Sequence, residues 1–270
     1  MLCGHIHLLP LAYLAARQFG VPLTLVVHGV EAWQPTRHRI ANQLVRRIDS
    51  FVAVSEFTKR RLMQWTGLRD EQGFVVPNCV DVSQFGVGAK RPDLLRRYGL
   101  EGKTVILTLG RLAGAERYKG FDEVIQVLPE LAREIPSICY VIAGDGPDRA
   151  RLEAKAAKLG VGERVVFTGY IDEREKADHY RLADAFVMPE RGEGFGIVYL
   201  EALACGIPVI ASMADASREA VRDGLLGQVV DPDCPEAIKN AILRALCGGR
   251  HAPDGLDHFS TDRFRERWYR

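Results

Sequence analysis

The chain has 270 residues, a length that fits one large domain or two modest ones. Its 36 Lys and Arg residues nearly balance 35 Asp and Glu residues, and the formal charge of +1 gives no reason to expect nucleic acid as a partner. Six cysteines show neither a CxxC pair nor metal-ligand spacing, so we expect buried free thiols, a reducing compartment and no metal centre.

The first part of the chain alternates apolar runs with helical stretches. The elements expected there, in chain order, are a strand remnant at Cys3–His7, a helix at Leu8–Phe19 ending at Gly20, a strand at Leu23–Val27, a basic helix at Arg37–Arg47, a strand at Ser50–Val54, a helix capped by Ser55 that runs to Trp65, and a strand at Gly73–Val76. Residues 1–82 thus hold about three full strands, whereas a domain usually has roughly 100–150 residues. We expect a partial Rossmann-like domain.

A glycine-containing stretch without periodicity, Ser83–Lys90, is typical of an interdomain linker. The helices expected after it are Pro92–Tyr98, Gly120–Glu134, one that follows Pro147 and ends at Leu159, Arg174–Ala183, Ile197–Cys205, Pro235–Leu246 and Asp262–Tyr269. The strands expected after it are Thr104–Leu109, Ile138–Ala143, Arg164–Thr168, Ala185–Met188, Pro208–Ala211 and Gly227–Val230. This alternation predicts an α/β fold with a doubly wound parallel sheet over residues 83–258.

The stretch from Ala185 to Ser212 reads as strand, glycine-rich loop, helix and strand. Glycines let the backbone approach a phosphate, and the first-turn N–H groups of the helix point at it. Glu193 lies in the loop and Glu201 in the helix, and a carboxylate accepts hydrogen bonds from vicinal hydroxyls. The pattern favours a sugar nucleotide. The alternative is a βα turn that needs glycine for its geometry, with both carboxylates in water.

The run from Glu193 to Glu201, Glu-Gly-Phe-Gly-Ile-Val-Tyr-Leu-Glu, resembles the Glu-x7-Glu motif of the retaining GT-B glycosyltransferases of family 4 (glycosyl transferases group 1), and further matches follow the family order along the chain. The resemblance implies two Rossmann-type domains: an acceptor-side domain at 1–82, lacking its N-terminal part, and a donor-binding domain at 83–258. It also implies that a terminal helix, 259–270, crosses back to the first domain.

The resemblance also assigns roles to residues. The residues it implies for catalysis are His28, Arg111, Lys119 and Glu193, with Arg111 and Lys119 on the donor diphosphate and His28 facing the donor sugar. Those it implies for donor binding are Asn78, Gly110, Tyr170, Ile171, Gly194, Phe195, Gly196, Ile197 and Glu201, the last on the ribose hydroxyls. Turn formation remains an alternative role for Asn78 and Tyr170, packing for His28, and Arg117 competes with Lys119 for the phosphate.

Two positions depart from the family pattern, which has glycine where this chain has Cys79 and Ala216. These departures put in doubt a positive φ at Cys79 and close backbone approach to the donor at Ala216. Asp231-Pro-Asp233 matches the Asp-x-Asp of metal-dependent transferases literally, but its place before a helix and its Asp-Pro dipeptide indicate a turn. We expect no metal and no cofactor.

These features predict metal-independent, retaining transfer of a hexosyl unit from a nucleotide diphosphate sugar, such as UDP- or GDP-hexose, to a glycan or lipid-linked acceptor. We expect a cytoplasmic protein, since no apolar run reaches the roughly 18 residues of a membrane span. Basic helix residues suggest peripheral contact with the inner membrane face, with a solvated face as the alternative: Arg37, His38, Arg39, Arg46, Arg47, Lys59, Arg60 and Arg61.

A different class of function also fits the sequence. Without its N-terminal strands the first domain would expose a sheet edge and part of its core. The chain would then be a non-catalytic sugar-nucleotide-binding or interaction module that needs a partner or forms a homo-oligomer. A fold-related phosphorylase is less consistent, because no pyridoxal-phosphate lysine motif is found.

Overall fold

The computed structural model describes residues 1–269 and divides into two compact units. The first unit comprises residues 1–78 together with the loop 192–195 and the C-terminal residues from Asp262. The second comprises residues 79–191 and 196–261. Each unit has its own parallel sheet, so the α/β fold with two Rossmann-type sheets is confirmed.

The first unit has a four-stranded sheet in the order β1-β2-β3-β4, with parallel pairing throughout. Its elements are β1 (Leu2–Cys3), α1 (Leu9–Phe19), β2 (Thr24–Val27), α2 (Arg39–Leu44), β3 (Ser50–Ala53), α3 (Glu56–Thr66) and β4 (Gly73–Val75), and helix α11 (Thr261–Trp268) ends the chain. Its core joins inward-facing strand residues to the helices, as in Leu25, Phe51 and Leu62. Ser55 caps α3 as predicted, since its hydroxyl accepts from the Thr58 backbone N–H.

The predicted strand at Cys3–His7 is wrong beyond Cys3. Residues Ile6–Leu8 form a 3₁₀ turn instead, and the His5 ring accepts a hydrogen bond from the His7 backbone N–H at its start. This local capping bond competes with strand pairing at His5. The predicted basic helix is also shorter than expected, because α2 ends at Leu44 and continues as a 3₁₀ turn over Val45–Arg47.

The second unit has a six-stranded parallel sheet in the order β10-β9-β8-β5-β6-β7. Its strands are β5 (Thr104–Leu109), β6 (Ile138–Ala143), β7 (Val165–Gly169), β8 (Ala185–Val187), β9 (Val209–Ser212) and β10 (Gln228–Val230). Its helices are α4 (Pro92–Tyr98), α5 (Phe121–Glu134), α6 (Arg149–Lys158), α7 (Lys176–Arg181), α8 (Ile197–Ala204), α9 (Ser217–Ala220) and α10 (Pro235–Cys247).

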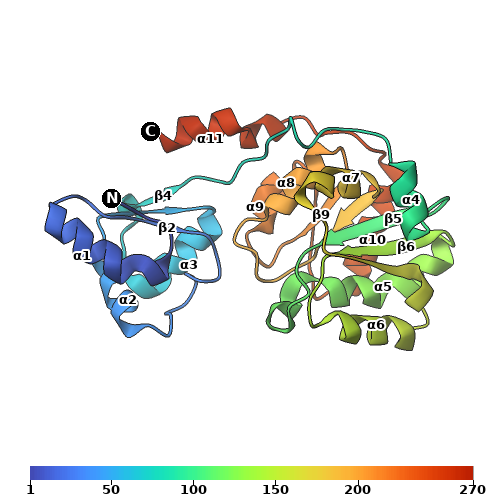
Figure 1. Cartoon of the computed structure of the whole chain (residues 1–270), viewed down its shortest axis with the longest axis horizontal. Coiled ribbons are helices and arrows are strands. Elements are labelled where there is room, and N and C mark those ends of the chain that lie inside the picture. The colour runs from blue at the N-terminus through green and yellow to red at the C-terminus, as the bar shows by residue number, and fades with distance from the viewer. Residues whose placement is uncertain (270) are drawn as a thin grey trace. The chain divides into compact units, whose positions relative to one another are not determined.

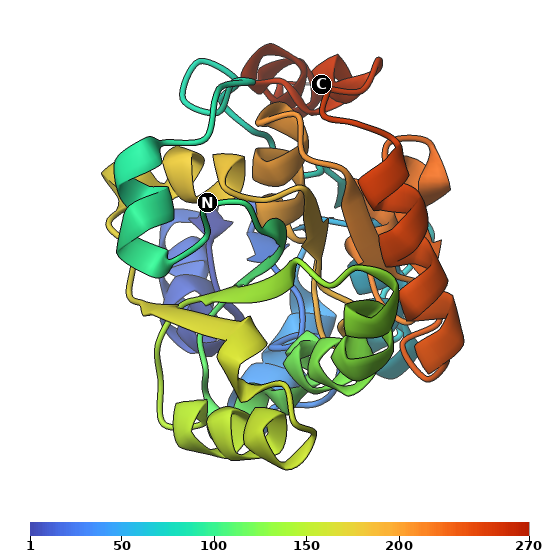
Figure 2. The same cartoon turned by 90° about the vertical axis from the view of Figure 1, so that its right-hand side faces the viewer.

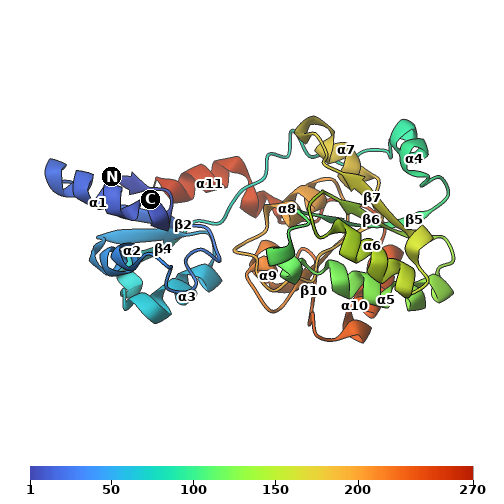
Figure 3. The same ribbon diagram turned by 60° about the horizontal axis from the view of Figure 1, so that its bottom comes forward.

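Helices cover both faces of this sheet. Helices α5 and α6 lie on one side and α7 and α8 on the other (Figure 1). Helix α10 runs beside α5 on the same side (Figures 2 and 3). Sequential strands lie on both sides of β5, which is the first strand of the unit, so the sheet is doubly wound as the alternation predicted.

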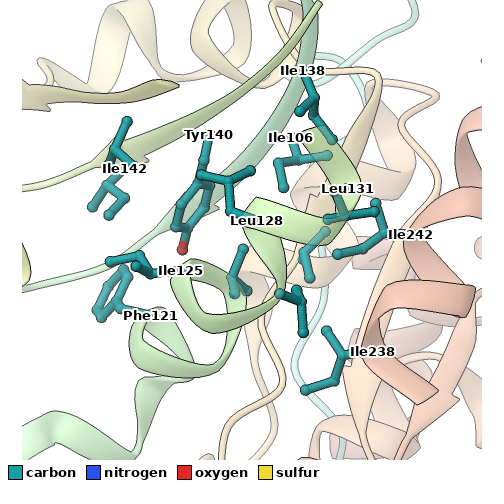
Figure 4. Packing of buried hydrophobic residues seen from close by; sticks show 14 of the residues in the cluster. Ile106, Phe121, Ile125, Leu128, Leu131, Ile138, Tyr140, Ile142, Ile238 and Ile242 are labelled. Carbon is teal, nitrogen blue, oxygen red and sulfur yellow. The ribbon is translucent and has the colours of Figure 1, made fainter. Parts of the chain in front are cut away.

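The core of the second unit lies between α5, α10 and the central strands. One face of α5 carries Phe121, Ile125, Leu128 and Leu131 at helical spacing, and these side chains point toward Tyr140 and its neighbours on β6 (Figure 4). Strand β6 is buried along its whole length. This packing fixes the carboxyl ends of β5 and β6, where the predicted donor loops begin.

No helix among residues 1–269 is both long enough and apolar enough to cross a membrane. Cys3, Cys139 and Cys205 are buried free thiols, as expected for the cysteines in apolar elements.

Candidate functional site

A cavity of about 270 Å³ opens at the carboxyl ends of three neighbouring strands of the second unit. Gly110 and Arg111 follow β5, Gly144 and Asp145 follow β6, and the segment Tyr170–Ile171 follows β7; all line it. Glu173, in the 3₁₀ turn before α7, and Lys176, the first residue of α7, also line the cavity. Open parallel sheets bind ligands at this edge, next to the strand where the order reverses. The structure thus brings together four of the predicted site residues: Gly110, Arg111, Tyr170 and Ile171.

A larger cavity, about 620 Å³, lies at the opposite edge of the same sheet. Its lining residues, among them Lys103, Ile138 and Arg164, precede or begin β5, β6 and β7. Amino ends of parallel strands are not the ligand-binding edge of this architecture. The smaller cavity is therefore the candidate site.

Two loops of the site approach each other at the backbone. A Cβ on Gly144 would lie 1.9 Å from the carbonyl oxygen of Gly110, and Gly144 has a φ of +144°. Only glycine allows this approach, which brings the loops after β5 and β6 into contact. Gly196, which precedes α8, has a φ of +91°. The glycine there permits the turn that starts the helix, as the glycine-rich loop predicted.

The two predicted phosphate cations share one carboxylate. Arg111 Nη2 pairs with Glu116 Oε1, and Lys119 Nζ lies 4.0 Å from Glu116 Oε2. Lys119 Nζ also lies 3.8 Å from Oε2 of the fully buried Glu190. The Arg111 side chain is 79% exposed whereas that of Lys119 is 14% exposed. Because its side chain is exposed, Arg111 can turn toward a ligand, whereas the mostly buried Lys119 side chain is held by its two carboxylate partners.

The segment that carries Glu116 is a kinked 3₁₀ helix over Gly114–Lys119, which the sequence did not predict. Arg117 lies in the same segment, and its Nη2 pairs with Asp148 Oδ1 at 3.3 Å. Hydrogen bonds from Arg151 lower the pKa of Asp148 below its usual range and keep this partner charged. Arg117 and Lys119 thus each pair with a carboxylate of this unit, and the choice between them for the phosphate stays a prediction.

Glu201, the predicted ribose-binding carboxylate, is 6% exposed on α8. Its Oε1 accepts from Lys176 Nζ at 2.8 Å and its Oε2 accepts from the Tyr180 hydroxyl at 2.7 Å. Burial, together with the negative charge of Glu201, raises the pKa of Tyr180 well above its usual value. The tyrosine is thus a permanent hydrogen-bond donor, and Lys176 connects Glu201 to the wall of the cavity.

Of the other predicted site residues, Ile197 begins α8 in the second unit, and the rest belong to the first unit. His28 follows β2; its Nε2 lies 3.0 Å from the Gly4 carbonyl oxygen, and its backbone N–H donates to Glu31 at 2.6 Å. Glu193, Gly194 and Phe195 form the loop grouped with this unit, and Asn78 is its last residue before the linker. The Gly194 carbonyl accepts from the Ser55 hydroxyl at 2.7 Å.

The backbone has ordinary φ values at both departures from the family pattern, and close approach of the donor at Ala216 stays untested. Arg222 and Asp223 are the non-glycine residues with positive φ within 1–269, so Cys79 has an ordinary backbone. Ala216 has a φ of −77° and needs no glycine. Asp231 and Asp233 form the predicted turn, in which the Asp233 backbone N–H donates to the Asp231 carboxylate. Asp233 also pairs with Arg191.

Sequence reasoning missed several residues of the site. Asp145 follows a strand in Gly-Asp-Gly, a signal that its position could have revealed. Lys176 and Tyr180 lie on a short helix without a motif, Glu116 lies in the 3₁₀ helix over Gly114–Lys119, and Glu190 lies in a loop. Lys176, Tyr180 and Glu190 matter through contacts with Glu201 and Lys119 that join distant parts of the sequence, whereas Glu116 pairs with Arg111 and Lys119 within its own loop region.

The family described as glycosyl transferases group 1 matches residues 90–253, more than half of the chain. The chain belongs to this family. The family described as Glycosyltransferase Family 4 matches residues 2–84 of this group 1 chain.

Curated relatives of this group 1 protein include a GDP-mannose-dependent alpha-(1-6)-phosphatidylinositol monomannoside mannosyltransferase of Mycolicibacterium smegmatis, 38% identical over 90% of this chain and 66% of the relative. A D-inositol 3-phosphate glycosyltransferase of Nocardiopsis dassonvillei is 33% identical over 86% of this chain and 58% of the relative. The chain therefore spans about two thirds of the length of the first relative and less of the second.

Solved structures share the fold. Anabaena HepE in complex with UDP has a TM-score of 0.83 at 21% identity, covering 99% of this chain and 76% of that one. A sucrose-phosphate synthase from Thermosynechococcus elongatus has a TM-score of 0.82 at 21% identity, with 99% and 71% covered. The GT-B architecture expected for this group 1 chain is thus confirmed.

Proposed function

We propose that this protein transfers a hexosyl unit from a nucleotide diphosphate sugar to a glycan or lipid-linked acceptor, with retention of configuration and without a metal. The observation that carries the proposal is the cavity at the carboxyl ends of β5–β7, with Arg111 in its wall and the Lys176–Glu201 pair beside it. The Arg111 guanidinium is a cation that can bind a diphosphate, and the buried Glu201 carboxylate can accept from ribose hydroxyls. Membership of the group 1 family supports the same chemistry.

We propose a GDP-linked hexose as the donor and an inositol-containing lipid or glycan as the acceptor. The support is the relative that is 38% identical, a GDP-mannose-dependent alpha-(1-6)-phosphatidylinositol monomannoside mannosyltransferase. Exposed basic residues of the first unit, Arg39 and Arg60 among them, suit an anionic lipid surface. Lys59 does not belong to that surface: its side chain is 10% exposed and pairs with Asp70.

In the proposed reaction the leaving diphosphate gains negative charge as the bond to the sugar breaks. Arg111 offers a planar fork of donors and Lys119 a point charge to stabilise it. The first-turn amides of α8, which begins at Ile197, add donors to the phosphate oxygens. The diphosphate then accepts the proton of the incoming hydroxyl on the same face of the sugar. His28 and Glu193 are proposed to contact that sugar.

Calorimetric titration of the chain with GDP, UDP and ADP, with and without a chelator, tests the donor half. We expect GDP to bind with the same affinity in both conditions. Glu201→Gln should weaken GDP binding about tenfold, because a charged acceptor of the ribose hydroxyls is lost. Glu130→Gln, which removes a surface carboxylate of α5 paired with Lys239, is the matched control and should bind as the parent does.

Turnover of GDP-mannose with an inositol lipid acceptor tests the transfer half. Release of GDP that depends on the acceptor supports the enzyme, and a product with the donor's anomeric configuration supports retention. Tight GDP binding without turnover favours the non-catalytic sugar-nucleotide-binding module. Unchanged GDP affinity in Glu201→Gln would remove the ribose role of Glu201.

A further inference from the structure

We propose that Tyr180 is a positioning residue that, together with Lys176, fixes the Glu201 carboxylate so that its two open acceptor sites match the two hydroxyls of a ribose. This inference rests on the proposed role of Glu201 in donor binding and goes beyond it. It assigns to a buried tyrosine the discrimination between ribonucleotides and nucleotides that lack the 2′ and 3′ hydroxyls.

Tyr180 is placed rigidly. It is fully buried on α7, and its ring lies 6.1 Å from that of Phe85 and 5.7 Å from that of Phe186, centroid to centroid. Helices α7 and α8 lie side by side (Figure 1), so the hydroxyl meets Glu201 directly. A side chain packed among rings has one rotamer, and its hydroxyl therefore holds the carboxylate at one position.

Lys176 holds the other oxygen. Its Nζ lies 2.8 Å from Glu201 Oε1 and 3.4 Å from Glu173 Oε1. A carboxylate that is 6% exposed requires such partners, because burial without them is costly. Each oxygen of Glu201 thus has one fixed donor from α7, and the plane of the carboxylate is set by both.

A count of acceptor sites indicates the ligand. An ionised carboxylate offers about four lone-pair sites, two on each oxygen. The donors of Tyr180 and Lys176 occupy one on each oxygen, which leaves one open site on each. A vicinal diol offers two donors at matching separation. Without the Tyr180 hydroxyl, the Glu201 carboxylate would rotate. The ribose diol would then have to immobilise the carboxylate when it binds, and that entropy cost weakens the affinity for the nucleotide.

The test compares two ligands in two proteins. Calorimetry measures the dissociation constants of GDP and of 2′,3′-dideoxy-GDP for the parent chain and for Tyr180→Phe. We expect Tyr180→Phe to weaken GDP binding about tenfold, as for loss of a hydrogen bond to a charged group, and dideoxy-GDP binding less than twofold. A role in packing alone would change both constants by the same factor, and that result would overturn the proposal.

Two further variants complete the design. Tyr140→Phe removes another fully buried hydroxyl, which contacts Thr108 in the core, and should leave both constants unchanged. Should Tyr180→Phe fail to fold, Lys176→Met removes the other fixed donor from a partly exposed position, and it should also weaken GDP more than dideoxy-GDP. Equal weakening would again contradict the proposal.

The outcome separates this inference from the proposed function. Loss of GDP binding in Glu201→Gln together with an unchanged GDP to dideoxy-GDP ratio in Tyr180→Phe would refute the positioning role alone. GDP affinity that does not respond to Glu201→Gln would refute the ribose site itself.

Discussion

At the scale of single residues, Glu116 already pairs with the two cations that we propose bind the donor diphosphate. Its carboxylate is 16% exposed and lies between Arg111 and Lys119, the two cations proposed to bind a diphosphate. An anionic ligand must therefore compete with an internal anion. Arg111 is mostly exposed, so its pair with Glu116 is screened by water and easily exchanged.

We therefore expect Glu116→Gln to tighten GDP binding by about threefold to tenfold, because the two cations lose their internal counter-charge. Calorimetry at two salt concentrations measures the effect, which should shrink as ionic strength rises. Glu236→Gln removes an exposed carboxylate of α10 and is the control. Weaker GDP binding in Glu116→Gln would show instead that Glu116 orients the cations.

At the scale of elements, a charged cluster joins α5 to α6. The Asp122 carboxylate on α5 accepts from Arg151 at 2.6 and 2.8 Å and from Lys155 at 2.9 Å, both on α6. Burial by itself would raise the pKa of Asp122, but the hydrogen bonds from these cations outweigh it and hold the pKa at about 2. The cluster fixes the helix that precedes β7 and its site loop.

A folded-state pKa below the unfolded value of about 3.9 means that this stabilisation is present above pH 4 and is lost as the pH falls through about 2. Asp122→Asn should lower the free energy of unfolding at pH 7 by on the order of 2 kcal/mol. Denaturant titrations from pH 7 to pH 2 should show the difference from the parent shrinking below pH 4. Asp254→Asn, at an exposed position, is the control for net charge. A difference that is constant with pH would contradict the assignment.

At the scale of the whole molecule, the proposed nucleotide contacts in the cavity belong to the second unit. A ligand that binds the folded state protects the amides of the unit that holds it. We expect saturating GDP to slow hydrogen exchange at residues 110–120, 144–148, 169–180 and 196–204. Mass spectrometry with peptide resolution measures this. Protection confined to residues 1–78 would place the nucleotide elsewhere.

The sequence by itself determined the order of the elements and the ends of the strands at which the site lies. Strands β5 and β6 and helix α4 have the bounds that the sequence predicted, because apolar periodicity and the glycines and prolines that end elements are local signals. The Glu193–Glu201 motif identified the family for the same reason. Gly110, Arg111, Tyr170 and Ile171 were predicted from the resemblance to the family, and they lie together because carboxyl ends of parallel strands meet at one edge.

Tertiary structure decided which side chains meet. The partners of Glu201 and Asp122, and the Glu190 partner of Lys119, come from other elements, and no spacing in the chain encodes the contact of Tyr180 with Glu201. The 3₁₀ turn at Ile6–Leu8 is a different case, because a local hydrogen bond at His5 replaced the predicted strand there. Propensity and pattern act over a few residues, whereas burial and charge pairing are set when distant segments pack. Most helices and strands could thus be predicted from the sequence, whereas the hydrogen bonds that position the charged side chains of the site form only when distant segments pack.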